Sequence, residues 1–125
     1  MTVQILVFDN QPKVGALIQS VAEPNGHHVT VTADAREFRS AVAQGMPDVI
    51  FVDVTVDNTN GIELLKHIHV TGCSAQIAIM SQLGQEPLRQ AQDYARAVGM
   101  RVIRALIKPF KGIEIVETLV SARNH

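Results

Sequence analysis

The sequence lacks most features that indicate a secreted, membrane-embedded or nucleic-acid-binding protein. Cys73 is the only cysteine, so an internal disulfide and a cysteine-based metal site are excluded. The 11 basic and 12 acidic residues nearly balance, which disfavours direct binding to nucleic acid or anionic lipid. No apolar run approaches the roughly 18 residues of a membrane-spanning helix, and the segment before Asp9 lacks the basic start of a signal peptide. We therefore expect a cytoplasmic protein with no direct contact to nucleic acid or membrane.

Linkers, repeats and low-complexity stretches are also missing, so we expect residues 1–125 to form one domain. Hydrophobic residues make up 46% of the chain and charged residues 18%, a balance that supports a compact core and excludes a disordered protein.

Short apolar runs alternate along the chain with longer stripes of helical period. This alternation predicts an α/β fold in which a doubly wound parallel sheet of five strands lies between two layers of helices. The predicted strands are 4–8, 28–31, 48–53, 77–80 and 101–107. The predicted helices are 13–22, a short one capped by Asp34, 61–70, 87–98 and 112–122.

Polar side chains stand at the ends of four of these strands. They are Asp9 with Asn10, Asp53, Ser81 and Lys108. Parallel sheets bind ligands at the carboxyl ends of their strands, so these groups should share one edge. Such an edge supports phosphoryl transfer to a carboxylate, with Asp53 as the nucleophile.

The same edge offers oxygen ligands for a hard cation. The carboxylates of Asp9 and Asp53, the amide of Asn10 and the backbone carbonyl of Thr55 are ligands of the type that Mg²⁺ prefers. The Lys108 ammonium and a serine hydroxyl would bind the phosphoryl oxygens.

Taken together, four stretches of the sequence resemble the receiver domain of two-component response regulators. They are Ile5-Leu6-Val7-Phe8-Asp9-Asn10-Gln11-Pro12, Pro47-Asp48-Val49-Ile50-Phe51-Val52-Asp53 with Gly61 eight residues on, Ile79-Met80-Ser81, and Lys108-Pro109-Phe110. The resemblance implies a CheY-like, flavodoxin-like (βα)5 fold with strand order 2-1-3-4-5.

The resemblance also assigns roles to the strand-end residues. Asp53 corresponds to the phosphoacceptor, Asp9 and Asn10 to the acidic pair, Ser81 to the switch hydroxyl and Lys108 to the lysine of the family. It implies a cis Lys108–Pro109 bond, Mg²⁺ as cofactor, and a histidine kinase or phosphotransfer protein as partner. The resemblance implies that the chain is not an enzyme and that its only reactions are Mg²⁺-dependent self-phosphorylation and autodephosphorylation.

Three residues depart from the family pattern. Asn10 removes one negative charge from the cation site and should weaken Mg²⁺ binding. Asp57, in the loop after Asp53, could restore part of that charge. Gln82 stands where the family usually has a small residue, so it would crowd the phosphoryl group or change how fast water removes it. Ala105 replaces an aromatic side chain that commonly acts as a rotamer switch. Output coupling should therefore pass through the loop after Ser81 and the helix that follows it, or through a different side chain.

These departures motivate an alternative, a degenerate receiver that acts as a protein-protein interaction module without phosphorylation. A flavin or nucleotide carrier on the same fold is disfavoured, because the loop after Asp9 lacks glycines to bind phosphate.

A partner surface is expected on helix 87–98, strand 101–107 and helix 112–122. The last helix carries an apolar stripe wider than one core contact needs, so it suits an output domain or a homodimer: Ile113, Ile115, Val116, Leu119 and Val120. Residues 94–103 are similar to receivers that precede EAL-type phosphodiesterase domains. All histidines, including the neighbours His27 and His28, are expected to be solvated.

Overall fold

The computed structural model describes residues 2–45, 47–56 and 60–123, which alternate between strand and helix along the chain. The strands are β1 (Gln4–Phe8), β2 (His28–Thr32), β3 (Val49–Asp53), β4 (Gln76–Ser81) and β5 (Val102–Ile107). The helices are α1 (Pro12–Ala22), α2 (Ala35–Gly45), α3 (Gly61–Val70), α4 (Gln85–Ala97) and α5 (Gly112–Arg123), with a short 3-10 helix η1 (Glu23–Asn25) after α1.

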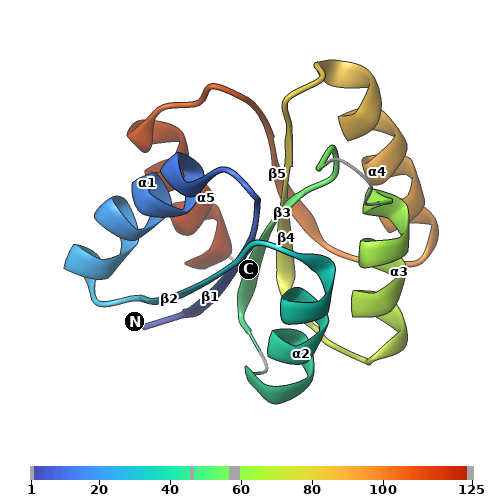
Figure 1. Cartoon of the computed structure of the whole chain (residues 1–125), viewed down its shortest axis with the longest axis horizontal. Helices are drawn as coiled ribbons and strands as arrows, with labels where there is room; N and C mark the ends of the chain where they lie inside the picture. Colours follow the sequence, from blue (N-terminus) through green and yellow to red (C-terminus); the bar gives the residue numbers. More distant parts are fainter. Residues whose placement is uncertain (1, 46, 57–59, 124–125) are drawn as a thin grey trace.

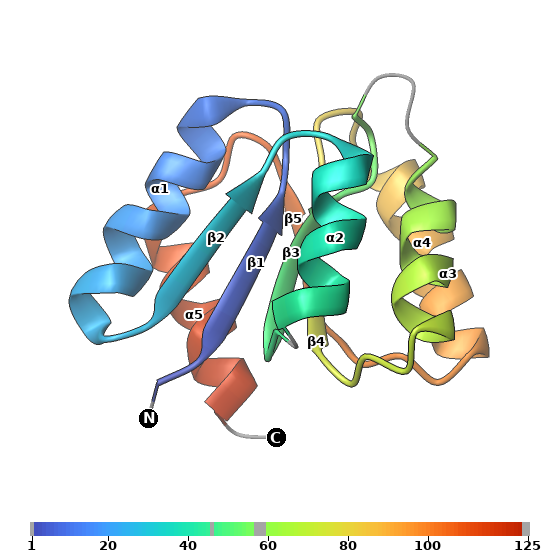
Figure 2. The same cartoon turned by 60° about the horizontal axis from the view of Figure 1, so that its bottom comes forward.

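All neighbouring strands pair in parallel, in the order β2-β1-β3-β4-β5. Helices α1 and α5 cover one face of the sheet, and α2, α3 and α4 cover the other (Figure 1, Figure 2). The predicted three-layer fold and strand order are confirmed. None of the helices in the described part of the chain is long and apolar enough to cross a membrane.

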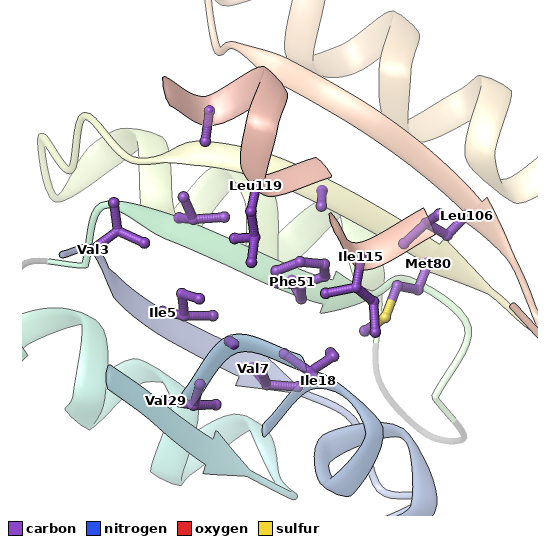
Figure 3. Packing of buried hydrophobic residues seen from close by; sticks show 14 of the residues in the cluster. Val3, Ile5, Val7, Ile18, Val29, Phe51, Met80, Leu106, Ile115 and Leu119 are labelled. Carbon is purple, nitrogen blue, oxygen red and sulfur yellow. The ribbon is translucent and has the colours of Figure 1, made fainter. Parts of the chain in front are cut away.

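The strand β3 is buried at every position because helices pack against both faces of the sheet at its centre. On one face, Ile18 of α1 and Ile115 of α5 pack over Ile5 and Phe51 of the sheet (Figure 3). On the other face, α2, α3 and α4 contribute the side chains Phe38, Val42, Leu64, Leu65, Ile68, Leu88 and Ala91 to a second core cluster. These two cores hold the sheet fixed below its carboxyl edge.

The start of α2 agrees with the sequence prediction, whereas the start of α4 differs from it. The Asp34 side chain accepts a hydrogen bond from the Glu37 backbone N–H at 2.8 Å, as expected of an N-cap. Helix α4, however, begins at Gln85 and not at Pro87. Gly84 precedes it with φ of 84°, and Pro87 fits the first turn because N–H groups there need no helical acceptor.

The expectation that all histidines are solvated is wrong for His27. Its side chain is buried, and its Nδ1 accepts a hydrogen bond from the Val3 backbone N–H at 3.1 Å. The neighbouring His28 is exposed in β2. The short helix η1, which the sequence did not predict, ends at the left-handed Gly26 and places His27 against the segment that precedes β1.

The register of the strands brings their carboxyl ends to one level. Phe8 pairs with Val52, and Ser81 pairs with Ile107. The residues that follow, Asp9 after β1 and Lys108 after β5, therefore meet the end of β3 at the same edge of the sheet.

Candidate functional site

Two acids and a lysine meet at the carboxyl edge of the sheet. The Asp9 and Asp53 residues are 2% and 0% exposed, and the Lys108 side chain is 7% exposed. The Lys108 Nζ forms ion pairs with Oδ2 of Asp9 and with Oδ2 of Asp53. One ammonium thus lies between two buried carboxylates, which leaves this cluster one negative charge in excess.

The backbone around Lys108 directs this side chain to the acids. Its N–H donates to the Ser81 carbonyl at 2.9 Å, which extends the pairing of β5 with β4 by one residue. The Lys108–Pro109 peptide bond is cis, as the family resemblance implies.

The loop after β3 orients the Asp53 carboxylate. Its Oδ1 accepts hydrogen bonds from the Thr55 backbone N–H at 2.6 Å and from the Thr55 hydroxyl at 2.7 Å. Its Oδ2 contacts Lys108. Both oxygens of the Asp53 carboxylate therefore accept hydrogen bonds, which fix its orientation.

The Asp9 carboxylate is less well compensated than Asp53. Its Oδ1 accepts one hydrogen bond from the Gln11 backbone N–H at 2.9 Å. Burial raises the pKa of the Asp9 carboxyl above its ordinary value of 3.8, and the interaction with Lys108 opposes this rise only in part. Ionisation of Asp9 therefore lowers the free energy of unfolding.

We expect the Asp9→Asn variant to be more stable than the wild type at pH 7. The folded state raises the pKa of Asp9, so it binds a proton more tightly than the unfolded chain does. The stability that this proton contributes is complete below pH 3.8 and is lost as the pH rises through the folded-state pKa. Urea unfolding midpoints should therefore be higher for the variant at pH 7 and converge with the wild type near pH 3. A lower midpoint for the variant at pH 7 would show that the Lys108 pair outweighs the burial of the charge.

Ser81 and Asn10 lie differently from the residues above. Ser81 is fully buried, and its Oγ accepts a hydrogen bond from the Leu83 N–H at 3.0 Å, so it forms a turn and does not cap α4, whose N-cap is Gly84. Asn10 is exposed and lines a groove of about 610 Å³ beside the start of α1. The structure thus joins Asp9, Asp53, Thr55 and Lys108 by direct contacts, and it places Ser81 in the adjacent strand and Asn10 at the rim.

No pattern in the sequence indicates Gln11 as a site residue. Its Oε1 accepts a hydrogen bond from Lys108 Nζ at 2.8 Å, and its Nε2 donates to Gln82 Oε1 at 3.1 Å. The sequence predicts for Gln82 that it crowds the phosphoryl group or changes how fast water removes that group. Its side chain instead makes specific hydrogen bonds to neighbouring polar groups.

The oxygen donors of the site are chemically suited to Mg²⁺. Within the described residues, no group of three or more His, Cys, Asp or Glu side chains gathers, so two carboxylates are the charged donors. The buried Oδ2 of Asp9 faces the Lys108 ammonium but accepts no hydrogen bond of normal geometry from the described chain. Such an oxygen suits a hard cation, with the Thr55 carbonyl as a further donor. Asp57 lies outside the described residues.

A buried acid held by a lysine and a hydroxyl thus lies at the carboxyl edge of a five-stranded parallel sheet, the edge at which doubly wound α/β proteins bind their ligands. The model of the response regulator receiver domain matches residues 5–120, so the chain belongs to this family. It is a phosphoryl-accepting signalling domain of two-component systems rather than an enzyme. The interaction module without phosphorylation is accordingly not favoured.

Several relatives match over most of the chain. Chemotaxis protein CheY of Thermotoga maritima is 24% identical over 117 residues, which are 93% of either chain. Sporulation initiation phosphotransferase F of Bacillus subtilis is 26% identical over 85 residues, or 68% of either chain. The transcriptional regulator NtrC of Azospirillum brasilense is 29% identical over 120 residues, but the chain spans only 24% of its length.

Solved structures confirm the fold. The chemotaxis response regulator CheY4 of Vibrio cholerae superposes with a TM-score of 0.81 at 22% identity, covering 98% of this chain and 99% of the other. A response regulator from Thermotoga maritima gives a TM-score of 0.83 at 16% identity over the whole of both chains.

Proposed function

We propose that Asp53 is the residue that accepts the phosphoryl group, from a histidine kinase or a phosphotransfer protein. The observation that carries this proposal is the position of Asp53, a fully buried acid whose Oδ1 is held by Thr55 and whose Oδ2 is held by Lys108. A carboxylate oxygen attacks the phosphorus, the bond between phosphorus and the donor histidine nitrogen breaks, and an acyl phosphate forms. We place this exchange in the cytoplasm, because the donor is phosphorylated by ATP, an intracellular compound.

Lys108 and Ser81 would stabilise the product. Lys108 already contacts the acceptor carboxylate, so its ammonium can pair with a phosphoryl oxygen after a short movement. The Ser81 Oγ accepts a hydrogen bond from Leu83, which leaves its own O–H proton free to be donated to the phosphoryl group.

Asp9, Asn10, Asp53 and the Thr55 carbonyl would hold Mg²⁺ in this reaction. The ion supplies positive charge against the phosphoryl oxygens when it is bound. An amide at position 10 provides an oxygen without charge, so we expect weak Mg²⁺ binding. The same residues support self-phosphorylation by small donors and hydrolysis of the acyl phosphate by water.

Output would pass through the loop after Ser81 to α4 and then to a partner on α4, β5 and α5. Ala105 of β5 packs beside the core under α4 and has no side chain that could change its rotamer. The predicted exposed stripe of α5 consists of Ile113, Val116 and Val120. Two of these side chains, Val116 and Val120, border the residues around η1, so an output domain or second copy on α5 would contact that side as well.

The assignment is tested by labelling the chain with acetyl phosphate in the presence of Mg²⁺. Intact mass should rise by one phosphoryl group, and EDTA should prevent the change. Borohydride converts an acyl phosphate of aspartate into homoserine, so peptide mapping after reduction identifies the acceptor. We expect homoserine at position 53, and homoserine at another position would refute the proposal.

A further inference from the structure

The side chains of Gln11 and Gln82 close a ring of hydrogen bonds over the acceptor. Lys108 Nζ donates to Gln11 Oε1 at 2.8 Å, and Gln11 Nε2 donates to Gln82 Oε1 at 3.1 Å. Gln82 Nε2 donates to the Thr55 carbonyl at 3.4 Å, and Gln82 N–H donates to Thr55 Oγ1 at 3.0 Å. Thr55 and Lys108 both bind Asp53, which completes the ring. We call the contact of the two glutamine side chains the amide bridge.

The amide bridge joins loops that are distant in sequence. Gln11 is the N-cap residue of α1, yet its side chain makes no cap hydrogen bond and extends across the site to Lys108 and Gln82. Gln82 belongs to the loop between β4 and α4. Both glutamines are exposed, whereas Asp9 and Asp53 below them are buried, so the bridge lies between the acids and solvent.

Each end of the amide bridge binds a group that phosphoryl transfer requires for a different contact. The Gln82 amide donates to the Thr55 carbonyl, which is an expected ligand of Mg²⁺. The Gln11 carbonyl binds the Lys108 ammonium, which is the expected counter-charge of the phosphoryl group. A donor N–H in front of the carbonyl oxygen repels a cation that approaches the same oxygen.

We infer that Gln11 and Gln82 are positioning residues that hold the site in its unphosphorylated arrangement and so slow phosphoryl transfer. The amide bridge holds Thr55 and Lys108 in the arrangement of the unphosphorylated site, and it opens when metal and phosphoryl group bind. This inference rests on the proposed function of Asp53. It assigns to Gln82 a role through directed hydrogen bonds and not through its bulk.

Methionine variants separate these two effects, because methionine has nearly the length of glutamine but neither its donor nor its acceptor. Gln82→Met should bind Mg²⁺ about fivefold more tightly than the wild type and be labelled correspondingly faster by acetyl phosphate, since one neutral hydrogen bond no longer competes. Gln11→Met should show the same trend. The double variant should resemble either single variant, because both substitutions break one bridge.

Mg²⁺ titration followed by NMR of the glutamine side-chain amides gives a direct signature. In the wild type, the Gln82 side-chain resonances should shift along the same binding curve as the backbone amide of Thr55. Gln44→Met is the matched control, because Gln44 is exposed on α2 and hydrogen-bonds Ser40 at 3.3 Å, away from the site. This control should titrate like the wild type.

Mg²⁺ binding no tighter in Gln82→Met and Gln11→Met than in the wild type would overturn the inference. Because both side chains are exposed, the variants should fold, and thermal melting confirms this before titration. Should Gln82→Met fail to fold, Gln11→Met tests the same bridge from its other end. Loss of labelling at Asp53 in every protein, the wild type included, would instead refute the proposed function, while the metal titration would still decide on the amide bridge.

Discussion

The Asp53→Asn variant is expected to take up no phosphoryl group from acetyl phosphate, under conditions that label the wild type completely. The side chain of asparagine is neutral and is a poor nucleophile, so the acyl phosphate cannot form. Its shape is nearly that of aspartate, so the amide oxygen can still accept from Thr55, as Asp53 Oδ1 does at 2.6 and 2.7 Å. The loss should therefore be chemical and not a consequence of unfolding, and intact mass spectrometry measures it.

The matched control for this experiment is Asp48→Asn. Asp48 is exposed at the opposite end of the sheet, where its Oδ2 accepts from the Gln4 N–H at 2.8 Å. This variant should be labelled like the wild type. If Asp53→Asn retained full labelling, the acceptor would have to be another residue, and Asp9 would be the first to replace in turn.

The sheet could be predicted from the sequence because its signal is strong and local. Continuous apolar residues in β3 require burial on both faces, and only a parallel sheet between two helical layers provides it. The start of α4 and the burial of His27 were not predictable in this way. The first depends on the backbone angle of Gly84, and the second on a hydrogen bond to Val3, which is distant in sequence.

The site residues that stand at strand ends could be predicted from the sequence. Asp9, Asp53 and Lys108 meet because the strand register places them at one level. The contact of Gln11 with Gln82 has no such cause, because long exposed side chains can adopt many rotamers and follow no periodic pattern. Hydrogen bonds of this kind appear only once the loops are placed in space.

Replacing Gly61 by alanine is the second change with a large expected effect. A Cβ at this position would lie 2.5 Å from Cβ, 2.6 Å from Cα and 2.7 Å from the carbonyl oxygen of Val54. Backbone atoms cannot rotate away as a flexible side chain can, so α3 or the loop after β3 must move. We expect a loss of about 3 kcal/mol in unfolding free energy, the upper range for overpacking, measured by urea denaturation.

The same substitution should also affect Asp53, because Val54 lies between Asp53 and Thr55 in the chain. Helix α3 begins beside it, with Asn60 Oδ1 accepting from the Ile62 N–H at 3.0 Å, so a shift at Gly61 moves the turn that orients the Asp53 carboxylate. Labelling by acetyl phosphate should therefore slow even where the variant is fully folded. Gly45→Ala is the control, since nothing lies within 4 Å of a Cβ there, and it should leave stability and labelling near the wild type. Unchanged labelling in folded Gly61→Ala would mean that the loop absorbs the added methyl group without moving Thr55, and that the close approach of α3 serves packing alone.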